Sequence, residues 1–71
     1  MMYFIELKNR LEQISPLAYQ RVVLKCIDYF KQYEFNFGEL VNPGENLQIP
    51  EELINILNEK ILELYDIEIF V

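Results

Sequence analysis

The chain has 71 residues, of which 52% are hydrophobic, and a formal net charge of −6. A chain of this length supports one hydrophobic core, so we expect a single domain over residues 1–71. Its apolar content argues against disorder, its negative charge against direct nucleic-acid binding, and the lack of any apolar run of ~20 residues against a membrane span.

The first predicted helix covers residues 3–14. Phe4, Leu7, Leu11 and Ile14 recur at spacings of three and four, which is typical of one face of an amphipathic helix. Charged side chains interrupt this stretch at four positions, so we expect no signal peptide here.

Ser15 and Pro16 predict the start of a second helix, because serine caps helix N-termini and proline fits the first turn. Two readings of its far end remain open: the helix runs to Gly38, or it breaks near Tyr33 and residues 34–41 form a short strand. Its expected core face is Tyr19, Val22, Val23, Cys26, Ile27, Tyr29, Phe30, Tyr33 and Phe37. On the polar side, Leu17 and Leu24 beside Arg21 form a second, weaker candidate patch for binding.

Turn-forming residues at 42–46 predict a loop, and Pro50 opens a third helix that runs to Tyr65. The tail, Asp66–Val71, alternates with the period of a strand, so it would pair with an internal segment or with another chain. The predicted fold is therefore mainly α, a three-helix bundle-like domain with a short β pairing that involves the tail. The expected core face of the third helix is Leu53, Ile54, Leu57, Ile61, Leu64 and Tyr65.

The negative charge lies in the second half of the chain. Residues 1–33 carry five basic and three acidic groups, a net +2, whereas residues 34–71 carry one basic and nine acidic groups, a net −8. Four of these acids recur within an arc of about 60° on the third helix, opposite its core face. We call them the acidic stripe: Glu52, Glu59, Glu63 and Asp66.

The acidic stripe is either an ordinary solvated surface or a binding surface. Lys60 is the only cation after residue 31, so the compensating pairs usual on a solvated helix are few. Ile56 and Leu62 flank the core arc and would leave apolar area beside the acids. The candidate protein-binding residues are Glu52, Asn55, Ile56, Glu59, Leu62, Glu63, Asp66 and Phe70.

The residues that most catalytic and metal sites need are missing. The sequence has no histidine and no threonine, and its one serine is explained as a helix cap. Cys26 falls on an apolar helix face, where a thiol is inert, and a lone cysteine suits a reducing compartment. We therefore expect no catalytic, cofactor-binding or metal site, no enzyme activity and no cofactor, and a cytoplasmic protein.

The order of LEQIS, then YEF, then LQIPEELINILNEKILEL resembles the helical pattern of some small acidic immunity or inhibitor proteins of polymorphic toxins and bacteriocins. This resemblance implies a helical fold and a basic partner such as a nuclease or another nucleic-acid-binding protein. The chain departs from the pattern at GELVNPGEN, where the family would continue as helix. No residue role is carried over from the family.

The leading functional hypothesis is a small acidic inhibitor, of the immunity, antitoxin or phage-inhibitor type, that occludes a basic surface of a target protein. The alternative is a non-enzymatic structural or adaptor subunit that forms a homodimer or completes a larger complex. A third route to a partner is strand addition through residues 66–71.

Overall fold

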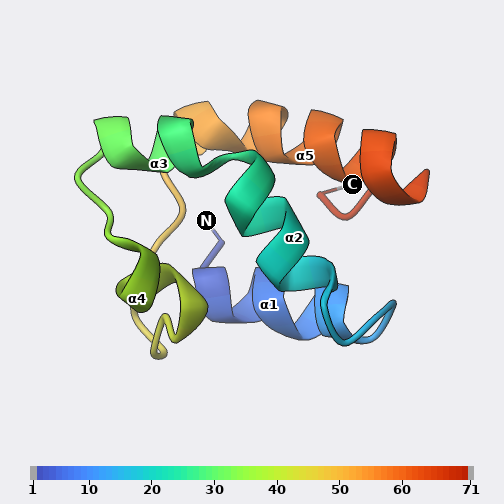
Figure 1. The fold of residues 1–71 in the computed structure, drawn as a ribbon, viewed down its shortest axis with the longest axis horizontal. Coiled ribbons are helices and arrows are strands. Elements are labelled where there is room, and N and C mark those ends of the chain that lie inside the picture. The colour runs from blue at the N-terminus through green and yellow to red at the C-terminus, as the bar shows by residue number, and fades with distance from the viewer. Residues whose placement is uncertain (1, 71) are drawn as a thin grey trace.

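Five helices, rather than the predicted three, make up the described part of the chain (Figure 1), residues 2–70 of a computed structural model. The mainly α fold class is confirmed. The helices are α1 (Phe4–Glu12), α2 (Ala18–Lys25), α3 (Ile27–Gln32), α4 (Phe37–Val41) and α5 (Glu51–Tyr65).

The α2 helix is central to the fold, because it contacts α1, α4 and α5. In Figure 1, α1 and α5 lie on opposite sides of the molecule and α2 crosses the space between them. The start of α5 lies beside the end of α3, where the Tyr33 hydroxyl reaches the Glu52 carboxylate. Among the described residues no helix is long and apolar enough to cross a membrane.

The predicted second helix breaks at Cys26, which separates α2 from α3. Cys26 leaves the helical region, with φ −106° and ψ 11°, while its N–H still bonds to Val22 and its carbonyl accepts from Tyr29 and Phe30. The apolar spacing continues across the break because Cys26 and Phe30 are both buried. Periodicity alone therefore predicted one helix where the chain changes direction.

Two short motifs determine the secondary structure after Tyr33, where the sequence was compatible with either a helix or a strand. Glu34 adopts a left-handed conformation (φ 65°) and ends α3, while Gly38 lies inside the next helix instead of terminating one. Asn36 then starts α4 with a capping box: its side chain accepts from the Glu39 N–H at 2.8 Å, and Glu39 accepts from the Asn36 N–H at 3.2 Å. The chain breaks near Tyr33 and continues as helix rather than strand.

The predicted β pairing of the tail is not supported. Asp66, in the left-handed region at φ 56°, turns the chain at the end of α5, and residues 67–70 form no strand; Val71 lies outside the described residues. One isolated antiparallel bridge, Tyr3 with Gln48, occurs in residues 2–70 instead. Backbone bonds of 2.9 Å on either side of it join the start of α1 to the strand-like segment 47–49.

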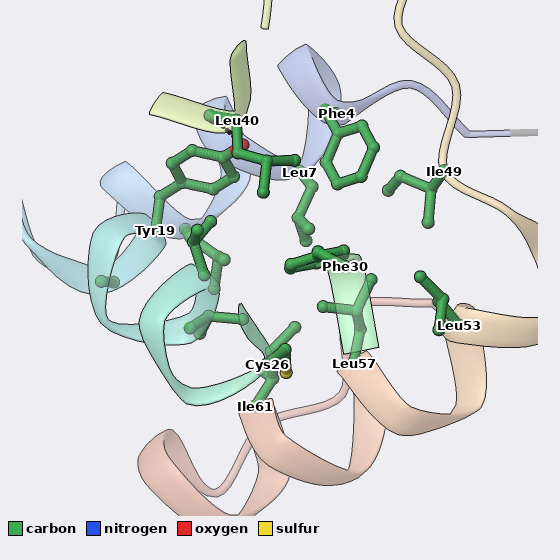
Figure 2. Close-up of a cluster of buried hydrophobic side chains, with 14 residues drawn as sticks. Phe4, Leu7, Tyr19, Cys26, Phe30, Leu40, Ile49, Leu53, Leu57 and Ile61 are labelled. Carbon is green, nitrogen blue, oxygen red and sulfur yellow. Dashed lines mark hydrogen bonds between the residues drawn. The ribbon is translucent and has the colours of Figure 1, made fainter. Parts of the chain in front are cut away.

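Side chains from all five helices and from Ile49 fill one core (Figure 2). Phe4, Phe30 and Phe35 meet edge to face, with ring centroids 5.3–6.3 Å apart. Figure 2 shows Phe30 between α1 and α5, and Tyr19 directed at Leu40, whose carbonyl accepts from the Tyr19 hydroxyl. The core prediction was wrong for five residues, which are about 40% exposed: Ile14, Tyr29, Tyr33, Phe37 and Leu64.

Candidate protein-binding surface

The last helix presents the acidic stripe because its opposite side is fixed in the core. Leu53, Leu57 and Ile61 are at most 3% exposed, and they recur every four residues along one side of α5. Rotating by 100° per residue places Glu52, Glu59 and Glu63 of the stripe on the far side of the helix. All four of its acids are exposed. The structure brings Glu52, Glu59 and Glu63 together on one face of α5, whereas Asp66 caps the end of the helix in the left-handed conformation (φ 56°), so the helical rotation does not place its side chain.

Few cations neutralise this face. The one ion pair on α5 in the described part of the chain joins Lys60 Nζ to Glu63 Oε2 at 3.6 Å, and the Glu63 side chain is half exposed. An exposed pair at this distance contributes little. Glu59 enters no ion pair within residues 2–70 and stands one turn from Glu63, so the two carboxylates repel each other.

The other predicted surface residues fall into two groups. Asn55 and Leu62 are exposed beside the stripe, with Leu62 at 41%. Ile56 and Phe70 are half-buried and pack against the core, so they offer a partner less apolar area than the sequence suggested. Leu62 is the main apolar side chain of this surface on α5.

Tyr33 extends the surface beyond α5, and the sequence reading missed it. Its hydroxyl donates to Glu52 Oε2 at 3.4 Å, and its side chain is 41% exposed. Desolvation of the phenol and the neighbouring Glu52 carboxylate raise the pKa of Tyr33. The residue was assigned to the core because it fits the apolar spacing of one continuous helix, and the break at Cys26 carries no sequence signal that would have corrected this.

Buried groups elsewhere supply no comparable chemistry. Burial raises the pKa of the Cys26 thiol to about 11, although Lys60 opposes the shift, so the thiolate is scarce near neutral pH. Residues 2–70 contain no group of three or more acids and cysteines placed to hold a metal ion.

A depression of about 240 Å³ lies between α1, α2 and α4, with the Lys8–Glu12 ion pair (3.1 Å) among its lining residues. It is smaller than the usual ligand pocket of about 300–1,000 Å³. A larger hollow of about 450 Å³ lies at the start of α5, and Glu52 of the acidic stripe is among its lining residues. The exposed acidic surface is therefore the strongest candidate site.

Comparisons with family models, curated proteins and solved structures found no match to this chain.

Proposed function

We propose that this protein is a small inhibitor that covers a basic surface of a target protein with the acidic stripe. The observation that carries the proposal is three exposed carboxylates on one side of α5 and a fourth, Asp66, at its C-terminal end, with a single, long ion pair among them within residues 2–70. The occluded surface would be one shaped for an anionic ligand, as on a nuclease or another nucleic-acid-binding protein. The inhibitor would then compete with the nucleic acid for the same cations.

The cost of the arrangement favours a binding role over simple solvation. Like charges four residues apart destabilise a helix by about 0.2–0.5 kcal/mol, as for Glu59 and Glu63. A solvated helix gains more from alternating signs. A row of like charges instead raises the association rate with a cationic partner and selects against anionic ones.

Leu62 and Tyr33 supply the apolar contacts that such an interface needs. Both are 41% exposed, and each borders the stripe, Leu62 on α5 and Tyr33 through its bond to Glu52. Tyrosine is enriched among the residues that dominate binding energy, because it buries a large rigid ring and keeps a polar end. The mechanism would be steric and electrostatic occlusion, with no covalent step.

A pair of variants with equal net charge tests the proposal. The stripe variant carries Glu52→Gln, Glu59→Gln, Glu63→Gln and Asp66→Asn. The control variant removes four exposed acids elsewhere, Glu34→Gln, Glu45→Gln, Glu51→Gln and Glu68→Gln. Each changes the net charge from −6 to −6 + 4 = −2.

The two variants and the wild type serve as bait in cell lysate, and a basic protein retained by the wild type is then purified for titration. We expect the control to bind this protein nearly as tightly as the wild type does, and the stripe variant to bind at least about 100-fold more weakly. The wild-type affinity should also fall with added salt. Equal losses in both variants, or no loss in the stripe variant, would refute the proposal.

A further inference from the structure

The outward face of α2 carries leucines and cations that no other part of the described chain covers. Leu17 and Leu24 are 51% and 52% exposed, the two highest values among the large hydrophobic side chains of residues 2–70. Arg21 and Lys25 are exposed beside them, and neither enters an ion pair within those residues. Two exposed leucines next to two cations without an ion pair in residues 2–70 form a helix face that could bind another surface.

This face and the acidic stripe share one spacing with opposite charge. On α2, Arg21 is followed by Leu24 and Lys25; on α5, Glu59 is followed by Leu62 and Glu63. In both helices a charged residue at position n is followed by leucine at n+3 and a like charge at n+4. The second charged residue lies about 6 Å along the axis from the first in each case.

The sense of rotation around the two helices fixes how they can meet. On each helix the leucine lies about 60° to one side of the first charge, and the second charge lies about 40° to its other side. Because both patterns turn in the same sense, the leucines fall on the same side of the contact only when the helices run antiparallel. That alignment places Arg21 opposite Glu63 and Lys25 opposite Glu59 of another molecule, with Leu24 next to Leu62.

We propose that a second copy of this chain is the occupant, and that α2 of one molecule docks antiparallel on the α5 acidic stripe of the next. Two ion pairs and a leucine contact would form together, and Leu17, seven residues before Leu24 on the same side of α2, lengthens the apolar edge. Lys60 competes for Glu63 within the same chain, so the Lys25–Glu59 pair gains most from association.

The geometry of the contact determines the kind of assembly. The two surfaces are different, so the interface is head-to-tail and leaves one α2 and one stripe free at the ends of each assembly. The α2 helix has eight residues and is about 12 Å long. An interface built on so short a helix falls below about 1,200 Å², in the range of weak and reversible complexes. The association is independent of the target proposed above, which would compete for the stripe.

Sedimentation equilibrium on the whole chain, between about 50 µM and 1 mM, tests the inference. At about 0.02 M salt the average mass should rise with concentration from the 8.6 kDa of one chain, without a plateau at twice that value, because the ends of each assembly stay free. At about 0.5 M salt most of the rise should disappear, because exposed charges are then screened. A wild type that stays at 8.6 kDa over this range would overturn the inference and leave the proposed function untouched.

Charge reversal on either side makes the test specific. The variant with Arg21→Glu and Lys25→Glu should stay a single chain, and so should the variant with Glu59→Lys and Glu63→Lys, since like charges then face each other. An equimolar mixture of the two should regain the association, which misfolded variants could not do. A variant that self-associates as the wild type does, or a mixture that remains monomeric, would count against the docking geometry.

A third variant controls for net charge. Lys31→Glu, Gln13→Glu and Asn46→Asp change the charge by −4, as Arg21→Glu with Lys25→Glu does, at exposed positions away from α2. This control should associate as the wild type does. If it lost association as fully as the variant with Arg21→Glu and Lys25→Glu, the effect would come from overall charge and the inference would be overturned. The α2 variant keeps the stripe intact, so it should still bind the captured basic protein.

Discussion

Glu34 occupies a backbone position that normally belongs to glycine. Its φ is 65°, and it sits between the last turn of α3 and Phe35. The Phe35 N–H bonds to the Phe30 carbonyl at 3.2 Å and the Glu34 N–H bonds to the Lys31 carbonyl at 3.0 Å, which together form a Schellman motif. The apolar contact typical of this motif is present as Phe30 against Phe35, with centroids 6.3 Å apart.

Glycine at this position should stabilise the protein. A side chain in the left-handed region costs about 1–2 kcal/mol, and glycine removes that cost. Part of the gain is lost because glycine gives the unfolded chain more conformational entropy. We expect Glu34→Gly to raise the free energy of unfolding by about 0.5–1 kcal/mol in urea titration. Glu34→Ala removes the charge and keeps the Cβ, so it should give no such gain; an equal gain in both would point to charge instead of backbone strain.

The buried thiol should make stability fall in mildly alkaline solution. Burial raises the pKa of Cys26 to about 11, whereas an unfolded cysteine titrates near 8.5. Between these values the unfolded chain releases its proton and the folded chain keeps it, so stability present below pH 8.5 is lost as pH rises. We expect a decrease of about 1.5 kcal/mol between about pH 8.5 and 10 from this thiol, to which Tyr19, whose pKa burial also raises, adds only near the upper end of the range.

Chemical denaturation across this pH range measures the effect. Cys26→Ala should be less stable at neutral pH because it loses core contacts, and its stability should change less steeply between pH 8.5 and 10. A profile as steep as that of the wild type would show that another group is responsible.

At the scale of the helix, patterns of local origin predicted the structure well. The fold class, the bounds of α5 from Pro50 onward and the core positions of α1 followed from apolar spacing and start signals. The break at Cys26 did not, because the buried side chains keep their spacing while the backbone turns. The exposure of Leu64 did not either: it lies in the core arc of α5, yet it is 39% exposed, since burial at a helix end depends on which neighbours reach it.

The candidate site was likewise predictable only where it depends on spacing within one helix. Helical spacing placed Glu52, Glu59 and Glu63 on one exposed face, as the structure has them. Tyr33 reaches this face from α3, and such a contact between helices 19 residues apart depends on tertiary packing that spacing does not encode.

The acidic stripe should lower the stability of α5 measurably. Glu59→Gln removes the repulsion with Glu63 one turn away, and we expect the free energy of unfolding to rise by about 0.2–0.5 kcal/mol at low salt. In about 1 M salt the gain should vanish, since screening then acts within about 3 Å. Glu68→Gln, an exposed acid after the helix, should have no effect; a matching gain there would assign the change to net charge.

At the scale of the whole molecule, one aromatic cluster joins the two sides of the fold. Phe4 of α1 is fully buried and meets Phe30 and Phe35 edge to face. Phe4→Ala should cost about 3–5 kcal/mol, as large-to-small changes at buried phenylalanines do. The total stability of a chain this short is about 4–10 kcal/mol. The variant should therefore lose a large part of that stability and unfold at a clearly lower temperature and urea concentration than the wild type, as followed by helical circular dichroism.

Phe37→Ala is the matched control for that prediction. Phe37 is 41% exposed at the start of α4, so the same change of side chain should cost no more than about 1 kcal/mol. If the two variants were destabilised equally, the cluster around Phe4 would not be the centre of the core.

The pairing at the start of α1 determines when this protein can finish folding during its synthesis. The Phe4 N–H bonds to the Leu47 carbonyl at 2.9 Å, and Arg10 Nη1 donates to the Ile69 carbonyl at 3.1 Å, 59 residues further along. At about 5–20 residues per second, a ribosome needs roughly 3–12 s to make that stretch, whereas helices form within about a microsecond. The α2 helix follows α1 closely and can cover part of its apolar face early in synthesis, whereas the contacts of α1 with residues 47 and 69 can form only when translation has passed those residues.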